Sequence, residues 1–217
     1  MKELDKKKKE LMHHLLNGGF LKTASIIMAF KEVPRQQFVL KGYEKYAYDD
    51  TPLPTINEST ISQPSTVAAM LEYLEPKTGE KILEIGTGSG WQSCLLSRCV
   101  SDSGNVVTIE IDEAVAKFAI KNIKRMKIKN IKVVIGDGSV GYAPDAPYDK
   151  IIYTAAAPRI STEIISQLRL GGRIIAPVGN KFMQVLKIID KVSENELSET
   201  EAGSFRFVPL KGKRGFD

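Results

Sequence analysis

Short apolar runs rich in β-branched residues recur along the second half of the chain. They occupy residues 81–86, 106–112, 131–137, 148–155 and 171–179. Segments with helical spacing separate most of them, and strands covered on both faces are typically near-continuous apolar runs. This alternation predicts an α/β fold with a doubly wound, mostly parallel sheet. Two further runs, 184–191 and 202–210, flank the acidic stretch 193–200 and predict a closing pair of strands joined by a turn.

The first part of the chain has apolar residues at helical spacing instead. Residues 2–16, 22–33 and 65–75 predict three helices. A chain of 217 residues is long enough for one domain with a sizeable core. We therefore expect a single domain, with an N-terminal helical and loop region over 1–76 and an α/β core over 77–217.

Composition narrows the class of protein. The chain is 42% hydrophobic and 26% charged, which is typical of a globular protein. No apolar run reaches the roughly 18 residues that would span a bilayer, and the N-terminus lacks the apolar segment of a signal peptide, so we expect a cytoplasmic protein. Cys94 and Cys99 lie five apart in one predicted helix and are expected to be buried thiols. The adjacent His13 and His14 have no partner ligand for a metal.

The chain has a net charge of +5, and many of its basic residues are clustered in one stretch. Seven basic and no acidic residues lie in 117–132. Such a stretch fits either a nucleic-acid patch or the solvated face of an amphipathic helix. Phe118 is its only aromatic residue, so base stacking has little support, and nucleic acid is not expected as a partner. The helix would bury an apolar face formed by Val115, Ala119, Ile120 and Ile123.

The segment LEIGTGSGWQS follows an apolar run and opens a predicted helix. Its glycines, Gly86, Gly88 and Gly90, alternate with Thr87 and Ser89. Glycine lets a chain turn sharply and lets a ligand approach the backbone, while free N–H groups at the helix start attract a polar ligand. A glycine turn after a strand is common, so this loop alone is a weak signal.

Acidic residues near the ends of the neighbouring apolar runs strengthen the prediction of a ligand site at the glycine loop. Glu110, with Ile111 beside it, is placed to accept hydrogen bonds from ribose hydroxyls; the alternative is a strand-end carboxylate facing solvent. Asp137 can accept from an adenine amino group, with Gly138 leaving room for the ring; the alternative is an ordinary Asp-Gly turn. Glu84 precedes the glycine loop by two residues and is expected close to the same ligand.

These features favour one nucleotide-like cofactor. The glycine spacing is GxGxG rather than the GxGxxG of dinucleotide folds, and no Walker lysine and serine follow it. Acidic partners without an arginine suit a ligand that has ribose and adenine but no phosphate. The sequence therefore predicts S-adenosylmethionine, with NAD as the alternative.

Several motifs resemble one known family, protein-L-isoaspartate O-methyltransferase, in particular its archaeal-type members. The similarity runs from Leu15 to Gly212. Its motifs are VPRQQFV, YAYDDTPLP, TISQP, LEIGTGSGW, VVTIEID, VVIGDGSVGY, APYDKIIYTAAAP, LRLGGRIIAPVG and FRFVPLKG. The resemblance implies a Class I methyltransferase fold, a mostly parallel seven-stranded sheet whose last strand is antiparallel.

The resemblance also implies the reaction. A methyl group passes from S-adenosylmethionine to the α-carboxylate of an L-isoaspartyl residue in a damaged protein or peptide, and the ester then cyclises to a succinimide. A sulfonium cation and a carboxylate anion cancel their charges during this transfer. The carboxylate is already ionised at neutral pH, so no strong general base is needed.

The resemblance places the active-site serine at Ser62. Thr60 and Ile61 would line the cofactor or substrate through their backbone. Ser62 also precedes a predicted helix, so the alternative is a helix N-cap, and the two roles are compatible. This stretch departs from the family, which usually has Gly-Gln where Glu58 and Ser59 stand. Glycine adopts backbone angles that glutamate reaches only at a cost.

Two other functions stay open at this point. The first is a methyltransferase for another peptide carboxylate or for tRNA, which only the basic stretch 117–132 supports. The second is a cofactor-binding homologue whose altered loop has impaired catalysis. Amino-group methyltransferases usually carry an Asn/Asp-Pro-Pro-Tyr pattern after the fourth strand, whereas here the small Ala155 to Ala157 would leave room for a polypeptide backbone. This argues against an amine of RNA or DNA as the substrate; the alternative is tight loop packing. The sequence leaves the oligomeric state open.

Overall fold

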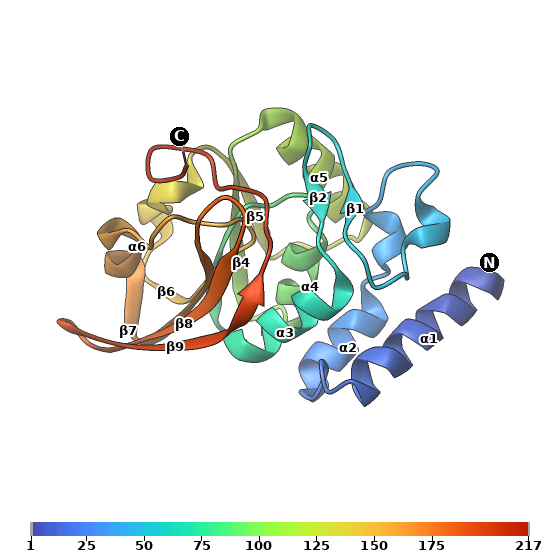
Figure 1. Ribbon diagram of the computed structural model, residues 1–217, viewed down its shortest axis with the longest axis horizontal. Helices are drawn as coiled ribbons and strands as arrows, with labels where there is room; N and C mark the ends of the chain where they lie inside the picture. Colours follow the sequence, from blue (N-terminus) through green and yellow to red (C-terminus); the bar gives the residue numbers. More distant parts are fainter. Residues whose placement is uncertain (1, 217) are drawn as a thin grey trace.

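The computed structural model describes residues 2–216, and a seven-stranded sheet forms its centre (Figure 1). The strand order is β5-β4-β3-β6-β7-β8-β9. The first five strands in this order are parallel, and the β7–β8 and β8–β9 pairs are antiparallel. The strands are β3 Lys81–Ile85, β4 Asn105–Glu110, β5 Ile131–Ile135, β6 Tyr148–Tyr153, β7 Leu168–Gly179, β8 Gln184–Ser193 and β9 Glu196–Phe205.

This sheet confirms the predicted fold class. One detail of the expectation is wrong: the strand that runs against the parallel five is β8 rather than the last strand. Because β9 is antiparallel to β8, it again runs in the direction of the parallel strands.

Helices and a small hairpin surround the sheet. The helices are α1 Lys2–Asn17, α2 Ala24–Glu32, α3 Pro64–Leu74, α4 Trp91–Val100, α5 Glu113–Arg125 and α6 Thr162–Gln167, and the hairpin consists of β1 Leu53–Pro54 and β2 Thr60–Ile61. Four short 3-10 turns lie at Arg35–Gln37, Glu44–Tyr46, Gly138–Val140 and Ala143–Asp145.

The strands divide their side chains between two apolar cores. Ile82 and Val106 belong to one buried cluster, and their successors Leu83 and Val107 belong to the other. This alternation follows from the pleat, which sends consecutive side chains to opposite faces. The sheet is therefore covered on both sides, as the near-continuous apolar runs predicted.

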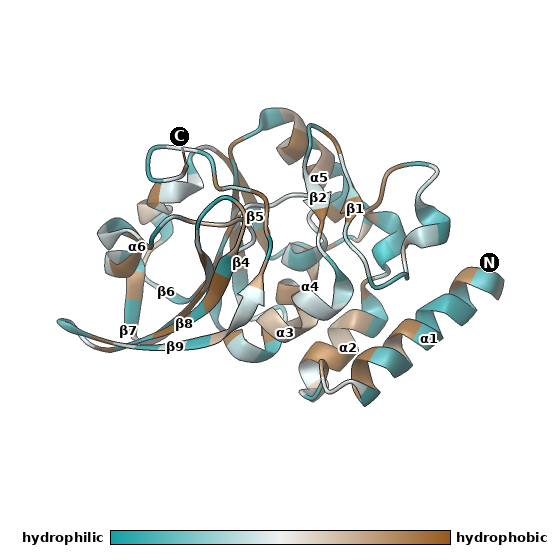
Figure 2. Ribbon diagram, in the orientation of Figure 1, coloured by the Kyte–Doolittle hydropathy of each residue, from teal (hydrophilic) through white to brown (hydrophobic). Residues whose placement is uncertain are grey.

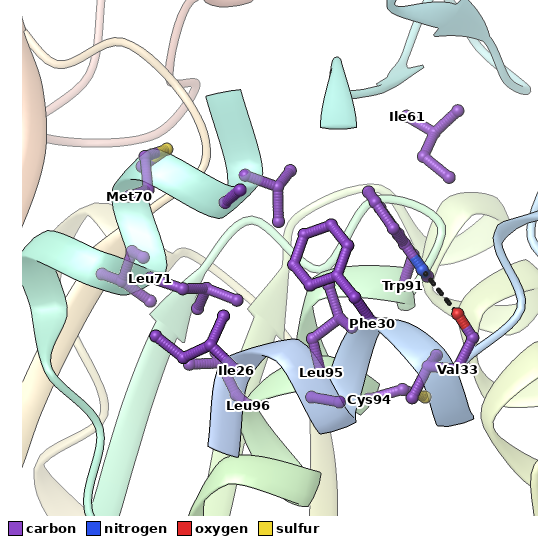
Figure 3. Packing of buried hydrophobic residues seen from close by; sticks show 14 of the residues in the cluster. Ile26, Phe30, Val33, Ile61, Met70, Leu71, Trp91, Cys94, Leu95 and Leu96 are labelled. Atoms are coloured by element: carbon purple, nitrogen blue, oxygen red, sulfur yellow. Dashed lines mark hydrogen bonds between the residues drawn. The ribbon is translucent and has the colours of Figure 1, made fainter. Parts of the chain in front are cut away.

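The larger core joins the N-terminal helices to α4. Figure 3 shows Phe30 and Val33 of the α2 region beside Trp91 at the start of α4. The Phe30 and Trp91 rings meet edge to face at 5.5 Å, and Trp91 Nε1 donates to the Val33 carbonyl at 3.3 Å. Trp91 is 3% exposed, so its indole nitrogen has a partner where water is excluded.

The end of the sheet differs from the predicted strands. The stretch 193–200 was predicted as a turn, but β9 begins within it at Glu196. Most side chains of β9 are exposed, and Figure 2 colours much of the strand as hydrophilic. An edge strand without an apolar face carries no alternation in its sequence. The closing pair of strands was therefore predicted correctly, but the bounds of its second strand were wrong: 202–210 was predicted, and β9 spans Glu196–Phe205.

Four basic residues of the stretch 117–132 lie exposed on α5, as its amphipathic pattern predicted; they are Lys117, Lys121, Lys124 and Arg125. The other three lie beyond the helix, with Lys132 in β5. Val115, Ala119 and Ile123 are buried. The prediction was wrong for Ile120, which is 42% exposed and does not belong to the apolar face. A helix turns by about 100° per residue, which carries the residue after Ala119 towards the rim of the stripe.

The cysteine and membrane predictions have simple outcomes. Cys94 and Cys99 are buried free thiols. His13 and His14 are exposed on α1, and the part of the chain that the structure describes contains no cluster of metal-ligating side chains. No helix within residues 2–216 is both long enough and apolar enough to cross a membrane.

Candidate functional site

A cavity of about 250 Å³ opens at the carboxyl edge of the sheet. The strands β3, β4 and β6 are parallel neighbours, so the loops that follow them meet there, at the edge where such folds bind ligands. The cavity is completed by the β1–β2 hairpin and by residues 208–211 near the C-terminus, both on this side of the sheet in Figure 1.

Most of the predicted site residues line this cavity. They are Thr60, Ile61, Ser62, Gly86, Thr87, Gly88, Ser89, Glu110, Ile111 and Gly138. Three others do not line it, namely Glu84, Gly90 and Asp137. The structure therefore brings together segments that the sequence separates widely, and it gives the remaining three residues other contacts.

The glycine loop owes its shape to two different constraints. Gly86 has a φ of +96°, and a side chain there would collide with Thr154 Oγ1. Gly90 has a φ of +81° and precedes α4 as its N-cap residue, where a Cβ would meet Ile123 at 3.1 Å. Gly86 thus permits the close approach of two loops, whereas Gly90 permits the packing of α4 against α5.

Glu110 faces the cavity from the end of β4. Its Oε2 accepts from the Gly88 N–H at 3.0 Å and its Oε1 accepts from the Asp112 N–H at 3.1 Å. These bonds fix the carboxylate beside the glycine loop and still leave acceptor positions on both oxygens. The arrangement is compatible with the predicted contact to ribose hydroxyls, which stays a prediction.

Asp112 links α5 to the hairpin loop. Its Oδ1 accepts from the N–H groups of Ala114 and Val115 and so caps α5, while its Oδ2 accepts from Asn57 Nδ2 at 2.9 Å. Asn57 and Asp112 both line the cavity. The loop therefore closes over the cavity through a side-chain bridge.

Glu84 lies beneath the cavity rather than in its wall. It is fully buried, and its Oε2 accepts from Ser93 Oγ and from Thr108 Oγ1. Thr108 Oγ1 is in turn 2.8 Å from Thr87 Oγ1 in the glycine loop. Burial raises the pKa of the Glu84 carboxyl to about 7. The residue thus supports the loop from below, and its Oε1 has no partner within the described residues.

Asp137 holds the C-terminal segment. Its Oδ1 accepts from the Ser139 N–H at 2.8 Å and its Oδ2 accepts from the Lys213 N–H at 2.7 Å. Arg214 then donates its backbone N–H to Ser139 Oγ and pairs with Glu163. These contacts fix the end of the strip 208–211 that walls the cavity.

Ser62 lies between two hollows. It lines the cavity and also a second hollow of about 350 Å³, which shares Thr60, Thr154, Val208 and Pro209 with it. The helix-cap alternative is wrong: the N-cap residue of α3 is Gln63, and the helix begins at Pro64. Asp50 instead accepts from the Ser65 N–H at 2.8 Å, so the first turn is capped from another segment.

Arg35 anchors the whole segment around Ser62, and sequence analysis did not identify it. Its side chain is buried, at 1% exposure. The guanidinium donates to the carbonyls of Ala47, Thr51 and Ser62 at 2.8, 2.9 and 3.0 Å. It also lies 5.4 Å from the centre of the Trp91 ring. Burial lowers the pKa of the guanidinium to about 10, so it stays charged at neutral pH.

The departure from the family motif has a visible backbone consequence. Glu58 has a φ of +61° and Asn57 a φ of +51°, both in the left-handed region. Asparagine tolerates this conformation, but glutamate does so at a cost. Glu58 therefore occupies a glycine-like conformation and brings a carboxylate into the cavity wall.

The small residues after β6 serve loop packing more than substrate space. Ala156 exchanges backbone hydrogen bonds with Val208 and Leu210, and the Ala157 N–H donates to Pro177. Both alanines are fully buried, and only Ala155 lines the cavity. The alternative of tight packing is thus the better description of Ala156 and Ala157.

Comparisons with known proteins find matches over nearly the whole chain. A family model described as Protein-L-isoaspartate(D-aspartate) O-methyltransferase (PCMT) matches residues 6–215. A protein-L-isoaspartate O-methyltransferase from Pyrococcus horikoshii is 41% identical over 217 residues, 99% of this chain and 97% of the relative. One from Methanopyrus kandleri is 38% identical over 210 residues, 96% of this chain and 93% of the relative.

Solved structures give the same result. A structure described as protein-L-isoaspartate O-methyltransferase superposes with a TM-score of 0.89 at 32% identity, covering 96% of this chain and 67% of the other. A Plasmodium falciparum structure, described as a complex with S-adenosyl-L-homocysteine, shares the fold with a TM-score of 0.82 at 24% identity. It covers 94% of this chain and 97% of the other.

Replacing Arg35 should loosen the segment around Ser62. In Arg35→Lys a single ammonium group replaces the planar guanidinium, so the carbonyls of Thr51 and Ser62 lose their hydrogen-bond donors. We therefore expect the free energy of unfolding to fall by about 2–4 kcal/mol. Urea unfolding measures this, and hydrogen exchange at the Thr55 and Ser59 amides should accelerate. Arg125→Lys, at an exposed arginine, is the matched control; an equal effect there would contradict the anchoring role.

The buried Glu84 should make stability depend on pH. The native state keeps a proton up to about pH 7 that the unfolded state releases near 4.5, so stability falls as pH rises between these values. The loss attributable to Glu84 is up to about 3 kcal/mol. Urea unfolding at pH 5 and pH 8 should show a smaller drop for Glu84→Gln than for the unchanged chain. Equal drops would refute this assignment.

The backbone at Glu58 gives a third prediction. Glu58→Gly should be more stable than Glu58→Ala by about 1 kcal/mol, because only glycine relieves the left-handed φ. Both variants lack the carboxylate, so their difference in free energy of unfolding reports the backbone alone. A more stable alanine variant would show that the loop has another conformation in solution.

Proposed function

The chain belongs to the protein-L-isoaspartate(D-aspartate) O-methyltransferase family, and we propose that it performs the family's reaction with Ser62 positioning the substrate. It is an S-adenosylmethionine-dependent methyltransferase of protein repair, acting on L-isoaspartyl residues. The match over residues 6–215, together with relatives of about 40% identity over nearly the whole chain, carries this conclusion.

The residues of the cavity fit the cofactor. Glu110 offers carboxylate oxygens at the strand end where ribose hydroxyls would lie, and Gly88 presents backbone rather than a side chain. The charged side chains of the wall are the acidic Glu58, Glu110 and Asp112 and the basic Lys211. An acidic wall suits a ligand that carries a sulfonium and an ammonium group, and it disfavours a phosphate-bearing dinucleotide.

The second hollow has the opposite charge. Its charged side chains are Lys181 and Arg206, and no carboxylate lines it. A carboxylate substrate is attracted to this side, while the cation-bearing cofactor is attracted to the other. Ser62 lies on the wall that the two hollows share, which is where the reacting groups would meet.

Positioning is the main task of the protein here. When bound, S-adenosylmethionine supplies the methyl group and a positive sulfonium whose charge disappears as the substrate carboxylate is esterified. The Ser62 hydroxyl donates one hydrogen bond to a carboxylate oxygen and so directs the other oxygen towards the cofactor side. A single bond orients the nucleophile without over-stabilising its charge in the ground state.

Arg35 and the glycine loop hold the Ser62 segment and the cofactor cavity in position. Arg35 holds the Ser62 carbonyl, and Trp91, which it contacts, begins the helix that follows the glycine loop. The substrate side and the cofactor side therefore share one buried support. We extend the proposal to a single-domain enzyme of the cytoplasm whose partners are isoaspartyl proteins and peptides.

An assay with paired substrates tests the function. Labelled S-adenosylmethionine is offered with peptides that differ only in isoaspartate or aspartate, and separately with tRNA. We expect base-labile methyl ester on the isoaspartyl peptide alone. Stable label on tRNA, or cofactor binding without transfer to any substrate, would overturn the proposal.

Ser62→Ala tests the positioning role. Loss of one hydrogen bond to a charged group should lower kcat about 10- to 100-fold. The affinity for S-adenosylhomocysteine, measured by calorimetry, should change less than two-fold, because the hydroxyl serves the substrate. Ser198→Ala, on the exposed strand β9, is the control and should keep full activity. Unchanged kcat in Ser62→Ala would remove this residue from the mechanism.

A further inference from the structure

The second hollow extends beyond the reacting groups. Ser62, Thr60 and Thr154 form the side that it shares with the cofactor cavity. Its other side is formed by Pro52, Gln63, Thr66, Lys181, Arg206 and Phe207. At about 350 Å³ it has room for more than the isoaspartyl side chain, so a side chain that flanks the isoaspartyl residue can also reach it.

The two cations stand on the side away from the cofactor. Lys181 is in the turn between β7 and β8, and Arg206 directly follows β9. Both line the second hollow and neither lines the cofactor cavity. Within residues 2–216, no carboxylate forms an ion pair with Arg206, whose side chain is exposed.

This placement separates the cations from the nucleophile. The reacting carboxylate must lie at the shared wall, next to Ser62 and the cofactor. A strong ion pair with that carboxylate would stabilise the ground state and slow the reaction. Cations on the far side of the hollow instead face whatever side chain flanks the isoaspartyl residue.

We propose that Lys181 and Arg206 form a specificity subsite for an acidic side chain adjacent to the isoaspartyl residue. This rests on the proposed function and adds to it a preference for the flanking sequence. Because both cations are accessible to solvent, each contributes a modest attraction that salt weakens. The preference therefore appears in KM rather than in kcat.

Peptides with one varied neighbour test the subsite. Isoaspartyl peptides carrying Glu, Gln or Lys immediately before or immediately after the isoaspartyl residue are compared at low ionic strength. For one of the two positions, we expect kcat/KM to be about three- to ten-fold higher with Glu than with Gln, and lowest with Lys. The difference should shrink in about 0.5 M salt.

Variants identify the responsible side chains. Arg206→Gln should reduce the preference for Glu, and Arg206→Glu combined with Lys181→Glu should reverse it in favour of Lys. Lys121→Gln, on the outer side of α5, removes one cation elsewhere and should leave the preference unchanged.

The peptide assays distinguish a failure of the acidic subsite from a failure of the proposed methyltransferase function. If no peptide is methylated, the proposed function fails. If the peptides are methylated with equal kcat/KM, or if the charge-reversed variant keeps the preference of the unchanged chain, the function stands and the acidic subsite is refuted.

Discussion

A buried guanidinium determines the geometry on which this enzyme depends. Among the described residues, the two terminal nitrogens of Arg35 donate to the backbone carbonyls of Ala47, Thr51 and Ser62 rather than to a carboxylate, while its buried Nε has no partner. Burying such a charge is costly unless most of its donors are paired, so the path of residues 47–62 is stabilised by the carbonyl acceptors that it supplies. The position of Ser62 is a consequence of this requirement.

The sheet supplies the second constraint, because parallel strands deliver their following loops to one edge. There two adjoining hollows differ in charge: three carboxylates and one lysine line the hollow proposed for the cofactor, and Lys181 and Arg206 line the hollow proposed for the substrate. In the proposed reaction, each of the two oppositely charged reactants is attracted to its own side of the shared wall. The wall needs only small, neutral groups, since the chemistry removes charge rather than creating it.

Local patterns predicted the fold well and the site in part. The parallel strands and the glycine loop were visible because apolar runs and glycine spacing depend on near neighbours. The role of Arg35 could not be predicted from the sequence, because its hydrogen-bond acceptors lie 12 to 27 residues away and are backbone atoms without a sequence signature. The same reason explains Asp137, whose carboxylate meets Lys213, and Asp50, which caps α3 in place of Ser62.

The cavity walls come from opposite ends of the chain. Residues 57–62 and 208–211 both line it, and backbone hydrogen bonds to Ala156 and from Phe216, together with Asp137 just beyond the strip, hold the second strip. Because these two strips are far apart in the sequence, the cavity is complete only when both have packed onto the same edge of the sheet. Cofactor affinity is therefore a readout of complete folding, and bound cofactor selects the finished molecule from its incomplete precursors.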